Sequence, residues 1–473
     1  MKAIHKKTLS VFGLVMINVI AIDSLRTLPM SAEYGLSVIF YYAAAALLFF
    51  IPVALVSAEL ATGWPENGGI YVWTREAFGK KFGFMTIWMQ WFYNLCWYPT
   101  IMSFIAATLA YCIDPHLVDN KIYMLTVVIL FFWAATLINF LGMKASGLLS
   151  AVSAIIGTLL PMIFITVLGV IWVMMGKPLS IDISWHSFFP DVSNINNLVL
   201  LTAVLYGLVG IEMSAAHAGE VENPQHNYPK AILWSALLIL STLVFSSLAI
   251  ALVIPQKQLN IVSGLLQAFE VFFTAFHMGW FMPILAFLIV LGSVGGVNAW
   301  ILGPSKSLLI ACHDGCLPEK LGRKNSHGVP VTILLLQGII FTVLCSVFLL
   351  MPTVTSGFWV LSNITSILAL IVYVAMFASA IRLRYKYPEV KRAFVIPGGK
   401  VGMWMICVIG SISCLFTIGV GFLPPSQIAV GNIRTYEFII SIGVVASCLL
   451  PFLVYAAHQH FGKVTHSNAE KIA

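Results

Sequence analysis

Long apolar stretches alternate with short polar ones along the whole chain. Twelve apolar runs can be marked, each long enough to cross a hydrocarbon core of about 30 Å as a helix. Most charged residues fall between the runs. The pattern therefore predicts an all-α membrane protein with about twelve transmembrane helices. The runs are 9–31, 35–61, 83–112, 122–141, 147–176, 195–218, 229–254, 280–311, 331–351, 357–381, 402–423 and 436–457.

Composition supports a lipid environment for most of the surface. Hydrophobic residues make up 60% of the chain and charged residues only 9%, whereas soluble domains usually carry about 25% charged residues. So few charges cannot cover a surface in water. We therefore expect a single transmembrane domain over residues 1–473, with the lipid bilayer as its main partner. The net charge of +7 does not indicate a nucleic-acid partner, because the basic residues lie in short loops.

The distribution of basic residues predicts the orientation of the spans. Of the 25 Lys and Arg residues, Arg26 lies within the first run and only Lys121, Lys177, Lys257 and Arg434 lie in the proposed outer loops. All the others lie in the proposed cytoplasmic segments. Positive charge favours the cytoplasmic side, so we expect both termini in the cytoplasm. We expect the membrane to be a plasma membrane, specifically a bacterial inner membrane.

Two halves of the chain have similar run lengths and spacings. Each half opens with a run that polar or small residues interrupt, which is typical of an inverted repeat with a binding site near the bilayer midplane. We expect repeat one over about 9–176, repeat two over about 195–384 and peripheral helices over about 402–457. The short apolar stretch 261–276 is expected to be an amphipathic helix at the outer surface, since counting it as a span would reverse the charge distribution.

The first run contains charged and polar residues at membrane depth. A charge there is costly and must face a cavity or a partner. Pro29 disfavours a regular helix nearby, and a break would free backbone groups for a substrate. We expect Asp23 to hold a substrate amine, Arg26 a carboxylate, and Ser24 to lie at the break. The alternative is that Asp23 and Arg26, three residues apart, pair with each other.

The sixth run combines glycines with acidic residues in mid-span. Glycines weaken a helix and permit close approach of a ligand, although they also permit close helix packing. Glu212 is a candidate for proton binding or a structural role, and His217 for pH sensing or a buried hydrogen bond. Glu220 is either a gate residue or a solvated charge. The candidates for substrate binding here are Tyr206, Gly207 and Gly210.

The sequence gives little support for metal, cofactor or enzyme chemistry. We expect no metal and no cofactor, because no metal-ligand spacing or phosphate loop is present. The histidines at 217, 313 and 327 form no set with a nucleophile, so the chain is not expected to be an enzyme; a membrane-embedded enzyme is a remote alternative. The eight cysteines are expected to be small buried hydrophobic residues.

Five segments of the chain carry recognisable motifs: 50–73, 207–224, 303–305, 328–332 and 394–400. Together they resemble the amino acid–polyamine–organocation (APC) superfamily of transporters, most closely its glutamate/γ-aminobutyrate antiporter branch. The resemblance covers nearly the whole chain and implies a ten-helix, five-plus-five inverted-repeat (LeuT-like) core with two peripheral helices. It also implies that Glu220, Trp300 and Tyr373 lie on the transport path; for Trp300 the alternative is ordinary packing.

The resemblance implies a secondary active amino acid transporter that works by alternating access. Its substrate is expected to be an amino acid or its decarboxylated amine. We favour antiport because the fifth run has no central lysine, which some proton-coupled relatives carry; a proton-coupled amino acid permease is the alternative. The glycine-rich stretch of many relatives at the first break is replaced here by residues 22–27. The protein is expected to be a monomer or a homodimer.

Overall fold

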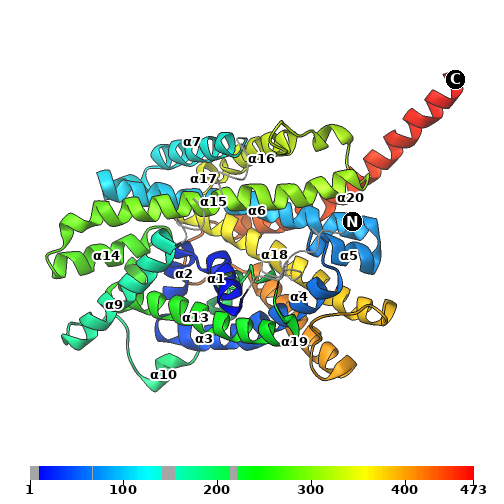
Figure 1. The fold of residues 1–473 in the computed structure, drawn as a ribbon. Helices are drawn as coiled ribbons and strands as arrows, with labels where there is room; N and C mark the ends of the chain where they lie inside the picture. The colour runs from blue at the N-terminus through cyan, green and yellow to red at the C-terminus, as the bar shows by residue number, and fades with distance from the viewer. Residues whose placement is uncertain (1–9, 67, 141–154, 213–220, 473) are drawn as a thin grey trace.

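The computed structural model describes residues 10–66, 68–140, 155–212 and 221–472. Every regular element in those segments is a helix, and ten helical stretches there are long and apolar enough to cross a membrane. In Figure 1 most of them run across the view, with α6 and α18 near the middle. The all-helical membrane fold predicted from the sequence is confirmed. The stretches are η2, α3, η3 and α4 (Gly35–Gly63), α6 (Lys80–Ile113), α7 (Lys121–Asn139), η5 with α9 (Ile155–Leu159 and Leu160–Met174), α13 (Pro224–Val253), η9 with α15 (Gly279–Phe281 and Met282–His313), α16 with α17 (Val331–Leu344 and Val347–Leu350), α18 (Val354–Lys386), α19 (Gly399–Gly421) and α20 (Ile433–Ile472).

The outer spans present large apolar side chains on their surface. Leu130 of α7 is 63% exposed and Leu453 of α20 is 65% exposed, as expected for helices that face lipid. By contrast, α18 is buried at every position from Gly357 to Leu370. Helices suit a bilayer because each satisfies its own backbone hydrogen bonds where no water is available.

The central span α18 has sequence signals at both ends. Thr353 caps its start: the Thr353 hydroxyl accepts from the backbone N–H of Ser356 at 3.1 Å, and the Ser356 hydroxyl accepts from the N–H of Thr353 at 3.1 Å. Arg384 and Lys386 lie in the last turn, where positive charge offsets the negative end of the helix dipole. These local features fix where the most buried span begins and ends.

The first span is broken, as predicted. α1 (Val11–Ile22) ends where Asp23 and Ser24 adopt extended backbone. A short 3-10 turn, η1 (Leu25–Thr27), then leads into α2 (Leu28–Ala32), and the two halves are bent by 47°. Pro29 lies in the first turn of α2, where its missing N–H costs nothing.

The sixth run is also interrupted. After the short helix η6 (Ile195–Leu198), α11 (Leu201–Tyr206) ends and residues 207–211 form turns. Gly210 has φ = +128°, a conformation that residues with a side chain rarely adopt. A Cβ at this position would lie 3.1 Å from the carbonyl oxygen of Ala21 and 3.4 Å from Cγ1 of Ile22. The second break therefore lies directly against the end of α1.

These two breaks determine how many spans can be counted in the described segments. The bent pair α1 and α2 raises the number of candidate spans from ten to eleven. The described part of the sixth run is a short apolar helix, Ile195–Tyr206, and residues 213–220 lie outside the described segments. A total of twelve therefore stays a prediction. The stretch 261–276 contains α14 (Gly264–Ala275), which is too short to be counted as a span, as predicted.

Two spans of different proposed repeats touch through glycines. A Cβ on Gly157, in η5, would overlap the backbone of Gly292 on α15. Small residues at such a crossing let two membrane helices approach backbone to backbone. Because neither residue has a side chain, this crossing is close.

The eight cysteines are all free thiols. Six are buried and Cys448 is partly buried, as expected for small apolar side chains. Cys112 is exposed instead, which corrects the prediction for this residue. It lies in the last turn of α6 beside Ile113, which is 72% exposed.

Buried charges tie the ends of two central spans together. Glu59, near the end of α4 (Ile51–Gly63), pairs with Arg384 of α18 and with Arg392, whose Nε lies 3.4 Å from Oε1. The N–H of Ile396 also donates to Glu59 at 2.8 Å. We call the side of the molecule that carries this cluster the basic face.

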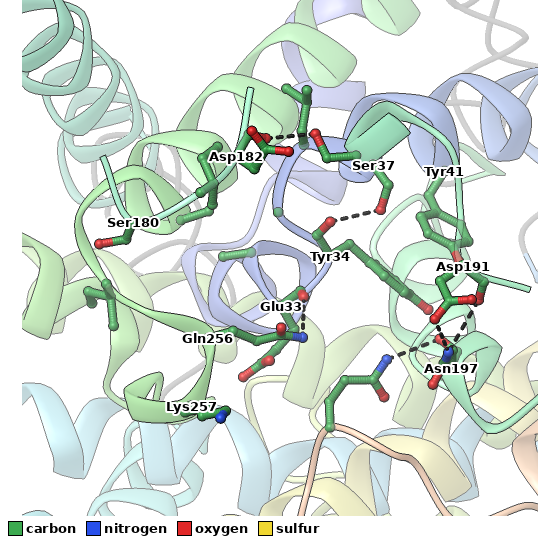
Figure 2. Close-up of a pocket in the computed structure, with 18 of the residues that line it drawn as sticks. Glu33, Tyr34, Ser37, Tyr41, Ser180, Asp182, Asp191, Asn197, Gln256 and Lys257 are labelled. Atoms are coloured by element: carbon green, nitrogen blue, oxygen red, sulfur yellow. Dashed lines mark hydrogen bonds between the residues drawn. The ribbon is translucent and has the colours of Figure 1, made fainter. Parts of the chain in front are cut away.

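A cavity of about 610 Å³ lies at the other end of the span Gly35–Gly63. Figure 2 shows Glu33, Tyr34, Asp191 and Lys257 among its lining residues. The 29 residues of that span correspond to roughly 40 Å of helix, so the cavity is far from the basic face. We call it the loop cavity. Its lining comes from residues 32–41, 180–197, 251–257 and 426–427.

Candidate functional site

The first break carries a buried carboxylate. Asp23 is 7% exposed, and its oxygens Oδ2 and Oδ1 lie 3.0 and 3.3 Å from the hydroxyl of Thr242 on α13. That hydroxyl also lies 2.9 Å from the carbonyl oxygens of Leu238 and Ile239. A hydroxyl has a single hydrogen to donate, so Thr242 satisfies the Asp23 carboxylate only in part.

Arg26 lies just after the break and is almost completely buried, at 1% exposure. Its Nη1 donates to the hydroxyl of Ser362 on α18 at 3.3 Å. The guanidinium carbon lies 5.8 Å from the ring centres of both Tyr206 and Phe358, within the range of a cation–π interaction. Its Nε has no hydrogen-bond partner.

Asp23 and Arg26 do not form the ion pair that we considered as an alternative. Asp23 contacts α13 and Arg26 contacts α18, so the two side chains leave the broken segment toward different spans. The extended backbone at residues 23 and 24 explains this divergence, because spacing by three residues brings side chains together only along a continuous helix.

The second break ends at another buried carboxylate. Oε2 of Glu212, a residue that is 6% exposed, accepts a hydrogen bond from the Tyr373 hydroxyl at 2.7 Å. Its Oε1 is enclosed without a partner. The Tyr373 ring packs edge-on against Phe49 at 5.3 Å. Glu212 therefore joins the second break to α18, as Arg26 joins the first.

The predicted substrate-binding residues of the two breaks lie close together, while Trp300 contacts the span α6. Tyr206 faces Arg26, Gly207 would place a Cβ 3.5 Å from the Tyr42 hydroxyl, and Gly210 contacts the end of α1. The side chain of Ser24 makes no capping hydrogen bond.

Trp300 lies on α15 and is half-buried. Its carbonyl oxygen accepts from the Tyr98 hydroxyl at 2.9 Å, and its ring lies 6.0 Å from that of Trp97. These contacts are with α6. His217 and Glu220 lie outside the described residues.

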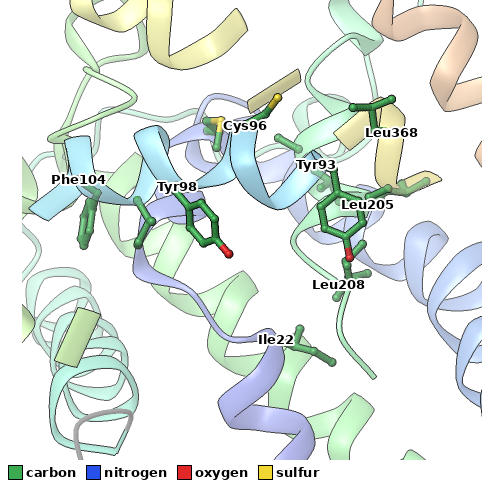
Figure 3. Packing of buried hydrophobic residues seen from close by; sticks show 14 of the residues in the cluster. Ile22, Tyr93, Cys96, Tyr98, Phe104, Leu205, Leu208 and Leu368 are labelled. Carbon is green, nitrogen blue, oxygen red and sulfur yellow. The ribbon is translucent and has the colours of Figure 1, made fainter. Parts of the chain in front are cut away.

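Aromatic residues of α6 complete the surroundings of the breaks. Figure 3 shows Tyr93 and Tyr98 projecting from α6 toward Ile22 and Leu208. Both tyrosines are buried. They therefore close off one side of the broken segments.

Sequence reasoning missed several of these partners. Thr242 and Ser362 are two of several hydroxyl residues within apolar runs, and Tyr93 and Tyr98 resemble ordinary core positions. A hydroxyl in mid-span is a weak signal, because such residues also bond to their own helix, as Thr365 does to the carbonyl of Leu361. Which helix each one faces depends on contacts between distant segments.

Comparisons with known proteins extend over nearly the whole chain. A family model described as amino acid permease matches residues 7–446. An uncharacterized transporter of Legionella pneumophila is 52% identical over 454 residues, which cover 96% of this chain and 98% of the relative. A glutamate/gamma-aminobutyrate antiporter of Lactococcus lactis is 32% identical over 471 residues, covering 98% and 93% of the two chains. A probable agmatine/putrescine antiporter of the same species is 25% identical over 417 residues, covering 87% and 88%.

Proposed function

Since this chain belongs to the amino acid permease family of the APC superfamily, we propose that it is an exchanger of an amino acid for an amine. The chain is a multi-pass membrane transporter of this superfamily. Two relatives named as antiporters, one for glutamate and γ-aminobutyrate and one for agmatine and putrescine, support the exchange proposal.

The observation that carries the proposal is the meeting of two interrupted spans. Gly210 of the second break contacts Ala21 and Ile22 at the end of α1. An interrupted helix leaves peptide N–H and C=O groups without their usual partners, and such groups can bind the carboxylate and ammonium of an amino acid. Binding through peptide groups fits substrates that share a backbone but differ in side chain.

The buried charges at the breaks fit the charged groups of such substrates. Arg26 has an unpaired Nε and no carboxylate partner, so we assign it to a substrate carboxylate. The side-chain donors to Asp23 and Glu212 are neutral hydroxyls, those of Thr242 and Tyr373. Oε1 of Glu212 has no hydrogen-bond partner, which leaves an acceptor for an ammonium group. An amino acid with a second carboxylate and its decarboxylated product differ in charge, so they would pair with different members of this set of buried groups.

Alternating access would follow from rocking of one repeat against the other around the breaks. We propose that both termini are cytoplasmic and that the membrane is a bacterial inner membrane. The charge distribution between the two sets of loops supports this orientation. The bacterial sources of the relatives support the membrane.

Counterflow in proteoliposomes tests the exchange proposal. Vesicles containing the purified protein are loaded with glutamate, with γ-aminobutyrate or with buffer, and uptake of labelled glutamate is followed. We expect uptake into both loaded preparations to exceed uptake into empty vesicles by roughly tenfold or more, because an exchanger returns only when occupied. Equal uptake into empty vesicles under an inward proton gradient would contradict exchange. Failure of this pair with success of another amino acid and amine would change only the substrate.

A second candidate function, proton-coupled uptake, is favoured by one observation. Glu212 is a buried carboxylate with one oxygen unpaired and a neutral hydroxyl on the other, an arrangement that can hold a proton. In that case Glu212→Gln would abolish proton-driven uptake while leaving counterflow intact. Loss of counterflow in the same variant would instead assign Glu212 to substrate binding.

A further inference from the structure

We propose that the loop cavity is a second ligand site, separate from the breaks, which binds a primary alkylammonium ion with Glu33 as its counter-ion. Its lining residues do not include Asp23, Arg26 or Glu212. The proposal therefore does not depend on the exchange mechanism. It assigns a role to Glu33, which the transport proposal does not use.

The position of Glu33 indicates a preformed binding site. Glu33 immediately follows α2 and is 4% exposed, although it lines a cavity of about 610 Å³. Its Oε2 is enclosed without a hydrogen-bond partner. The amide of Gln256 donates to its backbone carbonyl at 2.9 Å and holds the residue in place. A buried carboxylate oxygen without a donor is costly, and a ligand that donates hydrogen bonds would remove that cost.

The charges around the cavity favour a cation. Three carboxylates, those of Glu33, Asp182 and Asp191, line it, against a single ammonium group, that of Lys257. Asp191 already accepts from Asn197 at 2.9 Å, and Asp182 from Ser184 at 2.6 Å. Glu33 is the most enclosed of the three carboxylates and therefore the strongest candidate for direct pairing.

Hydrogen-bond acceptors without a partner and aromatic rings in the lining of the loop cavity favour an organic cation. The side-chain oxygen of Gln427 is a second enclosed acceptor without a partner. The rings of Tyr34 and Tyr41 are stacked at 3.9 Å and offer aromatic surface for an alkyl chain or for a cation. The volume lies in the usual range of small-molecule sites, about 300–1,000 Å³.

An inorganic cation fits less well. Metal ions bind several converging oxygen, nitrogen or sulfur ligands. In the described part of the chain, no group of three or more His, Cys, Asp or Glu residues is arranged to hold a metal ion. The carboxylates of the loop cavity are therefore too dispersed for a metal site.

Proton binding by Glu33 should tune the affinity. Burial raises the pKa of Glu33 to about 8. The carboxylate must ionise to pair with an ammonium group, so binding should strengthen as pH rises from 6 toward 9. The other ionisable groups around the cavity are Tyr34, Tyr41, Asp182, Asp191 and Lys257.

Calorimetric titration with n-butylammonium chloride tests the proposal on the full-length protein in lipid nanodiscs. We expect saturable binding that Glu33→Gln weakens roughly tenfold or more, as expected for a lost charge-assisted contact. Gln427→Leu should weaken it to a smaller extent and keeps the test usable if Glu33→Gln fails to fold. Asp119→Asn is the matched control, because Asp119 is an exposed carboxylate that does not line the cavity.

Two outcomes would overturn the proposal. If Glu33→Gln binds butylammonium as tightly as the unmodified protein while Glu212→Gln does not, the ion binds at the breaks. If sodium or calcium ions bind with a Glu33-dependent affinity that matches that of butylammonium, the cavity is an inorganic cation site. Counterflow by Glu33→Gln separates the two proposals, since it should persist when only the loop cavity is lost.

Discussion

At the scale of single residues, the candidate site depends on charged side chains that contact other helices rather than their own segment. Arg26 makes its contacts with α11 and α18 rather than with its neighbour Asp23. The free energy of burying such a charge is recovered only if a partner is present in some state of the transport cycle. A substrate carboxylate would be that partner.

Replacing Arg26 tests this role. Arg26→Gln should raise the KM for a carboxylate-bearing substrate in counterflow by roughly tenfold or more, because the amide carries no charge. Arg26→Lys keeps the charge and should be affected less. Arg434→Gln is the control, since Arg434 is exposed. An unchanged KM in a folded Arg26→Gln protein would restrict Arg26 to a structural role.

A second prediction for a single residue concerns the backbone conformation of Gly210. Gly210→Ala should destabilise the protein by about 1–3 kcal/mol, because alanine does not tolerate φ = +128° and its Cβ would crowd the carbonyl oxygen of Ala21. Unfolding by dodecyl sulfate measures the change. Gly419→Ala should shift stability by less than about 1 kcal/mol, because nothing lies within 4 Å of a Cβ there. Equal effects of the two substitutions would mean that the second break is not held in this conformation.

At the scale of elements, buried ion pairs join helices from different parts of the chain. Glu59 on α4 pairs with Arg384 on α18 and with Arg392 beyond it. Removing Glu59 would leave the two arginines facing each other in a region of low dielectric constant. The cluster therefore stabilises the packing of the spans at the basic face.

Glu59→Gln should lower the free energy of unfolding by about 3–5 kcal/mol, since it removes the buried carboxylate that pairs with two largely enclosed arginine side chains. Glu66→Gln is the comparison: Glu66 also pairs with an arginine, Arg75, but its side chain is 62% exposed. That change should cost less than about 1 kcal/mol. Similar losses in both variants would mean that water reaches Glu59.

Much of the element pattern could be predicted from the sequence. Apolar runs predicted the long spans, and Asp23 to Pro29 predicted the break in the first span, because a charge and a proline there oppose a regular helix. Partners such as Thr242 for Asp23 could not be predicted, since periodicity fixes neighbours within a helix and not across helices. Glu33 was missed because a buried carboxylate at the end of a run looks like a solvated loop charge.

At the scale of the whole molecule, the two sets of loops differ in charge. Arg75, Arg382, Arg384 and Lys386 belong to the basic face, and their side chains contact backbone or acidic groups there. The loop cavity at the far end is lined by three acids and one base. This asymmetry makes the orientation in the membrane testable.

Single cysteines placed in opposite loops should report that orientation. In a Cys112→Ser background, Val192→Cys should react with a membrane-impermeant maleimide in intact cells, because Val192 is 69% exposed beside the loop cavity. Glu319→Cys should react only after permeabilisation. Glu319 is likewise exposed, in η10 (Glu319–Gly322), which follows α15. The reverse labelling pattern would place the basic face outside.

The contact between Gly157 and Gly292 has a consequence for motion. Where two helices touch through side chains, a change of crossing angle requires side-chain rotamers to change. A contact between two glycines removes that requirement, so in the proposed rocking motion the two helices can change their crossing angle at low cost. Alanine at Gly157 would place its Cβ in the backbone of Gly292, force the helices apart and slow transport more than it weakens substrate binding.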